Sequence, residues 1–433
     1  MRKYKRAGRS GLKQSQKVGR SRLERPLHRA AVAPQQAIAI LGLLCAFPPL
    51  ATDMYLPAFP QMAQAFGVGD GAIQATLSIF FIGLALGQAV YGPLIDRYGR
   101  RIPLLIGIGI YVLSSLLCLV TSDIALFTGL RLLQAVGGCA GMIIGRAVVR
   151  DLFDEFESAR VLSLMMVMMT LAPIVAPVLG GFILAVSGWR MIFAVMLAFG
   201  MVGALLVWFG LPESLPPGKR RADNLSSIAR VFWRLLRTRA FIIPTLVGGL
   251  AQACMFAFIT GSPFVFMNLF GVSEQLYGWL FGSISVGLII AAQCNRFALK
   301  HWSPATLLGA ALILNIVAGL GTVIAAGSGV PVFLLIPLWF AIASLGFIGA
   351  NATAIVMTAC GQHLGSGSAL IGVLQFGCAF LVSSLVAAGQ NGTAYPMTLA
   401  IAGSGLLAGL FWLIPGGDNK LIAPGGQKRR HKT

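Results

Sequence analysis

Long apolar runs alternate with short polar breaks along most of the chain. Each run is about as long as the roughly 20 residues that an α-helix needs to cross a bilayer. The apolar residues within a run are continuous, which excludes a membrane β-barrel, whose strands alternate polar and apolar side chains. The pattern predicts an all-α membrane protein with twelve transmembrane helices, centred near residues 50, 82, 111, 135, 174, 201, 254, 285, 315, 342, 378 and 405.

The sixth and seventh runs are separated by a segment of different composition. It begins with Pro-Glu-Ser and continues as a basic stretch in which apolar residues recur at helical spacing, namely Leu225, Ile228, Val231, Phe232 and Leu235. A basic amphipathic helix of this kind is typical of a segment that lies on the membrane surface. The predicted organisation is therefore a basic tail, a six-helix half, a linker, a second six-helix half and a final tail, spanning residues 1–33, 34–211, 212–239, 240–415 and 416–433.

The composition agrees with this organisation. Of the 433 residues, 57% are hydrophobic and only 11% are charged, whereas about 25% of residues are charged in soluble proteins. Twelve spans need on the order of 240 apolar residues. They use nearly all the hydrophobic residues of the chain and leave no room for a soluble catalytic domain.

The net charge of +20, from 33 Lys and Arg against 13 Asp and Glu, would suggest a nucleic-acid partner in a soluble protein. Thirty of the 33 basic residues, however, fall in the tails, the linker and the loops on one side of the predicted membrane. Arg190 lies on the other side, and Arg131 and Arg146 lie within the fourth run. The positive-inside rule then predicts a multi-pass protein of the bacterial inner membrane with both termini in the cytoplasm and no nucleic-acid partner.

Residues 92–101 read Gly-Pro-Leu-Ile-Asp-Arg-Tyr-Gly-Arg-Arg and form the turn between the second and third runs. Glycine permits a tight turn, and the acid and arginines stand where two helix ends meet and can pair across a gap. The segment resembles the signature of the major facilitator superfamily at this turn. The resemblance implies a fold of two six-helix halves and a gating role for Gly92, Asp96, Arg97, Gly99, Arg100 and Arg101. The alternative is a solvated basic turn that only anchors the topology.

Two ionisable residues lie inside the spans at similar depth. Asp53 is roughly 13 Å from the outer end of the first span, and Arg131 is roughly 10 Å from the outer end of the fourth. A carboxylate in an apolar run is costly unless it is paired or protonated, so we expect Asp53 and Arg131 to couple transport to protons. Tyr55 and Gln134, close to them in sequence, are the expected substrate contacts. A static structural ion pair is the alternative.

The fifth span contains two prolines and a face of small residues, which suit a kink and close packing of another helix. Its segment from residue 172 to residue 181 resembles the antiporter motif of exporters in the same superfamily, with alanines at the first two glycine positions of that motif. The resemblance implies a role in conformational gating for Pro173, Pro177, Gly180 and Gly181. Generic helix packing is the alternative.

Together with the segments 52–60, 131–134 and 145–153, these motifs resemble the Bcr/CflA family of bicyclomycin and chloramphenicol resistance proteins. The resemblance is specific over residues 35–215. In the second half the resemblance rests on the number of spans. The turn equivalent to residues 92–101 reads Cys294-Asn295-Arg296-Phe297 there and has lost the motif. The family implies a drug:proton antiporter that exports amphipathic antibiotics, with the drug, protons and the bilayer as partners and the monomer as the expected state.

Other classes of protein lack support in the sequence. No G-x-x-x-x-G-K-[ST] motif for ATP occurs, and the seven cysteines and four histidines show no metal-ligand spacing, so neither a cofactor nor a metal is expected. The sequence also contains no cluster of a nucleophile and a base within the spans, so an enzyme is not expected. An exporter of an endogenous metabolite such as an amino acid, a proton-coupled nutrient importer, and a non-transporting receptor remain alternatives.

Overall fold

The computed structural model describes residues 34–220, 225–360 and 364–414. These residues form helices joined by short loops, and twelve of the helical segments are long and apolar enough to cross a membrane. The predicted all-α membrane protein with twelve transmembrane helices is thereby confirmed.

Six spans precede the linker. The first consists of short pieces, α2 (Pro34–Cys45), α3 (Phe47–Asp53), the 3-10 turn η1 (Leu56–Ala58) and α4 (Phe59–Phe66). The next five are continuous helices: α5 (Asp70–Tyr98), α6 (Arg101–Val120), α7 (Ile124–Leu152), α8 (Glu155–Ser187) and α9 (Trp189–Gly210). A short 3-10 turn, η2 (Pro217–Lys219), follows them.

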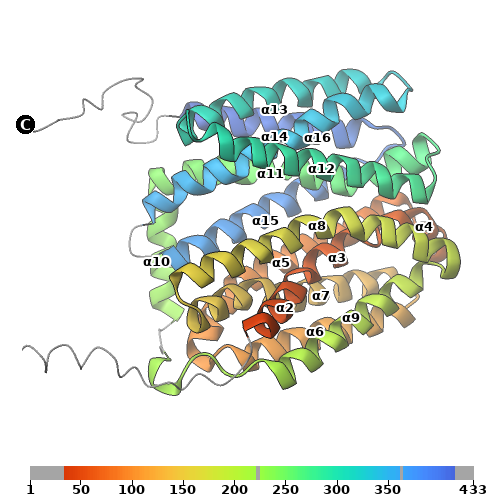
Figure 1. Ribbon diagram of the computed structural model, residues 1–433. Helices are drawn as coiled ribbons and strands as arrows, with labels where there is room; N and C mark the ends of the chain where they lie inside the picture. The colour runs from red at the N-terminus through yellow and green to blue at the C-terminus, as the bar shows by residue number, and fades with distance from the viewer. Residues whose placement is uncertain (1–33, 221–224, 361–363, 415–433) are drawn as a thin grey trace, which may run out of the picture.

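The second half repeats this plan after α10 (Leu225–Arg237). Its first span is α11 (Arg239–Pro263) extended by the π-helix η3 (Phe264–Leu269). The others are α12 (Glu274–Ala298), α13 (Pro304–Ala326), α14 (Pro331–Ala359), α15 (Leu364–Ala388) and α16 (Tyr395–Leu413). In Figure 1 the two groups of six lie one above the other, and the halves meet where α5 packs against α15 and α8 against α12.

The amphipathic helix α10 marks one end of the bundle, which we name the linker end. Its Leu235 is buried in a small apolar cluster with Phe241, Val356, Cys360 and Leu370, at the adjacent ends of α11, α14 and α15. Val231, Phe232 and Leu235, which belong to the apolar face expected to lie on the membrane surface, therefore pack against the second half. Figure 1 shows α10 lying across this end of the helices.

The opposite end, named the far end, is where the two halves are in close contact. A Cβ atom at Gly71 on α5 would lie 2.7 Å from the carbonyl oxygen of Ala387 on α15. One at Gly278 on α12 would lie 3.0 Å from the carbonyl oxygen of Pro177 on α8. Backbones approach this closely only where no side chain intervenes, so the described conformation is closed at the far end.

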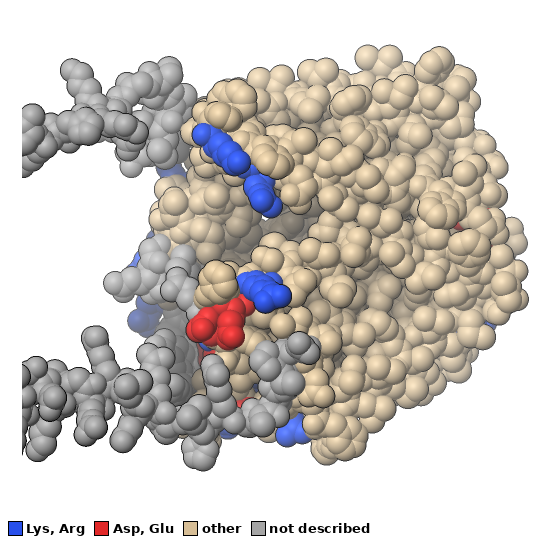
Figure 2. Space-filling model, viewed as in Figure 1, with Lys and Arg blue, Asp and Glu red and all other residues tan. Residues whose placement is uncertain are grey.

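The described basic residues mark the linker end. The turns that follow α5, α7 and α12 all lie there together with α10. Most of the described lysines and arginines belong to these turns, to the helix ends that adjoin them, to α10 or to the segment just before α10. Figure 2 shows most of the visible Lys and Arg side chains at this end, where the surface is hollowed between the halves. The molecule is thus closed at the far end and open at the basic linker end.

Candidate functional site

The first span is interrupted in its middle by two prolines. Pro57 and Pro60 lack the N–H group that would continue the helical ladder, and α3 ends at Asp53 before the 3-10 turn and α4 resume the path. Irregular backbone at membrane depth is tolerated where protein buries it or where it lines a cavity. Leu56, Pro57 and Ala58 are all buried, so the break is enclosed by neighbouring helices.

Asp53 is placed at the end of α3 by this break. Only 3% of the residue is exposed, and its Oδ1 atom has no hydrogen-bond partner among the described residues. A buried carboxyl group in such a position is stable only when it is neutral, paired or reached by a donor. Keeping the Asp53 carboxyl ionised inside the span is therefore costly in this conformation.

Arg131 is fully buried close to Asp53 but does not form an ion pair with it in this conformation. Its guanidinium group donates to the carbonyl oxygen of Ala51 at 2.7 Å and to the side-chain oxygen of Gln134. It also lies 4.1 Å from the ring centroid of Tyr55 and 4.5 Å from that of Phe80. The cation is thus stabilised by a carbonyl, an amide and aromatic faces, all of which favour a buried arginine.

Tyr55 and Gln134, expected to contact substrate, belong to this buried network. The Tyr55 hydroxyl lies 3.3 Å from Thr76 Oγ1, and the Gln134 amide nitrogen donates to Ser115 Oγ at 2.7 Å. Both side chains are fully buried. The structure therefore brings Tyr55, Arg131 and Gln134 together around α3, in a core that is closed in the described conformation.

The small-residue face of α8 contacts both the break in the first span and the second half. Pro173 and Pro177 lie within a single continuous helix. A side chain at Gly180 would overlap the carbonyl oxygen of Met54, next to Asp53, and a Cβ atom at Gly181 would lie 3.0 Å from the carbonyl oxygen of Glu274. The face predicted to allow close packing does so on two sides.

Charged groups link helix ends at the turn formed by residues 92–101. Arg100 binds Asp96 at 2.8 Å and Asp151, at the end of α7, at 2.9 Å. The backbone N–H groups of Arg100 and Arg101 donate to Glu213, beyond α9, at 2.8 and 3.2 Å. Burial alone would lower the pKa of Arg100, but the hydrogen bonds and charges of the two aspartates outweigh it and raise the pKa. The guanidinium group therefore stays charged.

The other members of the motif occupy the same turn. Gly99 has a φ of 90°, a conformation that favours glycine, and it packs against Glu213. Arg97 lies over the ring of Tyr98, and the Cβ position of Gly92 faces open space. Sequence reasoning missed Asp151 and Glu213 as partners of the turn, because an acid at a helix end or just beyond one resembles any solvated residue. In the second half, an uncharged pair, Asn295 and Asn351, joins α12 to α14 at 2.8 Å.

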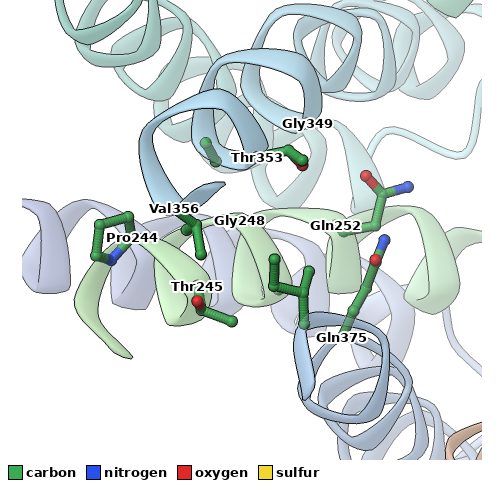
Figure 3. A pocket seen from close by; sticks show the side chains of 11 residues that line it. Pro244, Thr245, Gly248, Gln252, Gly349, Thr353, Val356 and Gln375 are labelled. Carbon is green, nitrogen blue, oxygen red and sulfur yellow. The ribbon is translucent and has the colours of Figure 1, made fainter. Parts of the chain in front are cut away.

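A pocket opens on the linker-end half of α11, α14 and α15. No charged side chain contributes to it, and its polar groups come from Gln252, Gln375, Thr245 and Thr353. Figure 3 shows Gln252 on α11 and Gln375 on α15 extending into the same space. The remaining lining residues are Pro244, Gly248, Gly249, Gly349, Ala352, Val356 and Ile371. Sequence analysis did not select this pocket, although two glutamines inside apolar runs were a visible signal.

Metal chemistry finds no support in the described ranges, where His, Cys, Asp and Glu form no group of three or more that could hold an ion. The polar features of the site are thus a buried carboxyl, a separately bound arginine and an uncharged pocket. These groups suit binding and proton transfer within a helical bundle rather than bond cleavage.

Comparison with known proteins gives consistent matches. Residues 41–383 match the family model of the Major Facilitator Superfamily. The chain is 33% identical over 352 residues to an uncharacterized MFS-type transporter, YdgK, of Bacillus subtilis, covering 80% of this chain and 88% of that one. It is 31% identical to a bicyclomycin resistance protein homolog of Haemophilus influenzae, with coverages of 78% and 85%. It is 32% identical to a chloramphenicol resistance protein of Pseudomonas aeruginosa, with coverages of 73% and 70%.

Among solved structures, the xylose transporter XylE from E. coli, in a partially occluded inward open conformation, superposes with a TM-score of 0.69. The match covers 89% of this chain and 98% of XylE at 13% sequence identity. At that identity the likeness concerns the arrangement of the helices and not the substrate.

Proposed function

The chain belongs to the major facilitator superfamily, as its resemblance to the Bcr/CflA family implied, and from this membership we propose that it is a proton-coupled exporter of amphipathic drugs. The superfamily consists of transporters, and the structural neighbours are transporters as well, which confirms the prediction that the chain is not an enzyme. The observation that carries the proton-coupled part of the proposal is the buried Asp53 carboxyl with an unpartnered oxygen.

The proposed orientation places the linker end and both termini in the cytoplasm of a bacterial cell, with the protein in the inner membrane. The support is the gathering of described lysines and arginines at that end, which the positive-inside rule associates with the cytoplasmic face. In this orientation the described conformation opens inward, and a drug reaches the pocket from the cytoplasm or the inner leaflet. We propose that the transporter acts as a monomer.

The proposed substrates are amphipathic antibiotics of the chloramphenicol or bicyclomycin kind. Relatives at 31% and 32% identity are named for resistance to bicyclomycin and chloramphenicol. The uncharged pocket suits such compounds, because it combines apolar walls with the amides of Gln252 and Gln375. Tyr55 and Gln134 remain proposed drug contacts. Because both are buried in the described conformation, we propose that the drug contacts them in another conformation of the cycle.

Asp53 is the proposed proton carrier. It takes a proton from the outside when the far end is open and releases it inside when the linker end is open, with drug binding favouring the deprotonated form. One proton crossing 100 mV supplies about 2.3 kcal/mol, and one pH unit adds about 1.4 kcal/mol. Together they support roughly 500-fold accumulation of a neutral substrate, so one acid is energetically sufficient.

Arg131 contributes to the same proposal by holding the backbone of α3 two residues before Asp53. The turn at residues 92–101 and the small-residue face of α8 are the proposed gates. The first ties helix ends together at the linker end through Arg100, and the second packs against α12 toward the far end.

Expression in an efflux-deficient bacterium tests the function. We expect reduced susceptibility to chloramphenicol or bicyclomycin, and we expect everted membrane vesicles to concentrate the drug only when a proton gradient is imposed. Unchanged susceptibility across a panel of amphipathic antibiotics, combined with export of an amino acid, would favour metabolite export. Proton-driven uptake of a nutrient in the opposite direction would identify an importer.

A further inference from the structure

The three helices that line the pocket carry almost no charge. Over their whole length α11, α14 and α15 contain one charged residue, Arg239, which is exposed at the start of α11. Pro244, the pocket residue nearest to it in sequence, follows more than one helical turn later. A ligand in this pocket therefore meets no opposite charge from its walls, whichever sign of charge it carries.

Two glutamine amides reach into the pocket from neighbouring helices at the same level. A Cβ atom at Gly249 on α11 would lie 3.6 Å from the Cα atom of Gln375 on α15, and Gln252 follows about one turn later on α11. A Cβ atom at Gly349 on α14 would lie 3.8 Å from Oε1 of Gln252. Glycines thus allow the helices to approach and leave the two amides facing one space, as Figure 3 shows.

Both amides keep most of their hydrogen-bonding capacity. A glutamine amide offers two N–H donors and an acceptor oxygen. The Gln252 nitrogen lies 3.3 Å from the sulfur of Met255, and a thioether is a weak acceptor. The Gln375 amide is bonded to no described residue. Polar groups that line a pocket without strong protein partners are suited to bind the polar groups of a ligand.

The entrance to the pocket is basic. Val356 belongs both to the pocket and to the apolar cluster that includes Leu235 of α10, so α10 lies beside the pocket at the linker end. Arg230, Arg234 and Arg237 recur every three or four residues along α10 and are all exposed. A cation that approaches from this end is therefore repelled before it reaches walls that hold no acid.

An ion inside this pocket would be poorly compensated. It loses its hydration on entering, and a buried charge is stable only when an opposite charge and hydrogen bonds replace that hydration. Two amides can replace the water around an amide or hydroxyl group of a ligand, but they supply no opposite charge. The pocket therefore discriminates between ligands by their charge.

We propose that Gln252 and Gln375 are specificity-determining residues, which select uncharged compounds with both hydrogen-bond donors and acceptors and exclude organic cations. The inference rests on the proposed drug-export function. Chloramphenicol belongs to this chemical class, because it is uncharged and carries an amide and hydroxyl groups. Gln252→Glu would supply the opposite charge that a cation lacks in the wild-type pocket, and so should change the charge of the preferred ligand.

Calorimetric binding to the purified protein tests this proposal, with chloramphenicol as the neutral probe and tetraphenylphosphonium as the cationic probe. We expect the wild type to bind tetraphenylphosphonium at least about tenfold more weakly than chloramphenicol. Gln252→Leu and Gln375→Leu should each weaken chloramphenicol binding about two- to tenfold, because a hydrogen bond is lost. Gln252→Glu, at about pH 8 to keep the carboxyl ionised, should bind tetraphenylphosphonium at least about tenfold more tightly than the wild type does.

Gln293→Glu is the matched control. Gln293 is exposed on α12 and does not line the pocket, so the same change of charge there should leave both affinities in place. Gln375→Glu repeats the test from the other wall, should Gln252→Glu fail to fold.

Three outcomes would overturn the inference: equal affinity of the wild type for both probes, unchanged chloramphenicol binding in both leucine variants, or a gain of cation binding in Gln293→Glu that equals the gain in the pocket variants. The proposed function fails separately, if the purified protein shows the expected preferences while wild-type vesicles show no proton-driven chloramphenicol transport.

Discussion

At the scale of single residues, the acidic Asp53 and the basic Arg131 lie in the centre of the first half without forming an ion pair. Arg131 binds the Ala51 carbonyl and the Gln134 amide and lies over two aromatic rings, with only its Nε atom lacking a hydrogen-bond partner among the described residues. Asp53 has no such contacts to its free Oδ1 atom. A fixed ion pair would hold the carboxylate charged throughout the cycle. The observed separation leaves the protonation of Asp53 free to respond to the conformation around it.

The first prediction concerns this acid. Asp53→Asn removes the titratable group while keeping the size and polarity of the side chain. Drug accumulation in everted vesicles under an imposed pH gradient should fall to the level of empty membranes, because no proton is carried. Equal membrane abundance and an unchanged thermal midpoint in detergent serve as controls. Full gradient-driven accumulation by this variant would remove Asp53 from the mechanism.

Arg131→Ala should act differently, by destabilising the fold. It removes two hydrogen bonds and the aromatic contacts of a fully buried cation. The Ala51 carbonyl and the Gln134 amide oxygen then lose their donor, which costs about 1–3 kcal/mol for each acceptor. We expect a lower thermal midpoint in detergent and a changed pH dependence of transport, because α3 loses its anchor beside Asp53. Arg131→Met, which keeps most of the side-chain volume, should recover part of the stability. Unchanged transport and pH dependence in Arg131→Ala would contradict a role in coupling.

The sequence predicts the presence and depth of these two ionisable residues but not the groups that surround them. An acid and a base inside apolar runs are visible without a structure, and their depth follows from helix geometry. The partners of Arg131 are not visible, because a carbonyl such as that of Ala51 becomes available only where a particular helix packs.

At the scale of elements, α8 is the link between the first span and the second half. Its prolines and glycines were recognised from the sequence, and its contacts explain why small residues are needed on both sides of it. The pocket, by contrast, was missed. Its walls come from three helices. The two glutamines stand out within their apolar runs, but only the packing of the helices brings them to one space.

Gly278→Leu tests the contact between α8 and α12. The new side chain would meet the backbone of Pro177 and Val178, which cannot move aside as a flexible side chain can. Closure of the far end should be hindered and drug transport reduced at least about tenfold, a penalty of about 1.4 kcal/mol or more on the closed state. Gly109→Leu is the control, since nothing lies within 4 Å of its Cβ position. Equal transport by both variants would show that this approach is not needed for the cycle.

At the scale of the whole molecule, the two halves differ in how they treat charge. The first half carries the acid of the span, the buried arginine and the ion pairs of the turn at residues 92–101. The second half supplies the uncharged pocket, the Asn295–Asn351 pair and the hydroxyls of Tyr277 and Ser262. Proton binding and drug binding are therefore proposed to lie in different halves, and their coupling must pass through the movement of one half against the other.

A cross-link across the far end tests this division of roles. Asn268, at the end of η3, donates to Asp70, at the start of α5, at 2.9 Å, which joins the halves at an accessible position. In a functional variant without its native cysteines, Asp70→Cys with Asn268→Cys and a short bifunctional thiol reagent should hold the far end closed. Transport should stop while chloramphenicol still binds from the linker end, because the pocket opens there. Reduction of a cleavable cross-linker should restore transport, and each single cysteine treated alike serves as a control. Continued transport with the far end cross-linked would mean that the halves need not separate there, and proton entry to Asp53 would require another route.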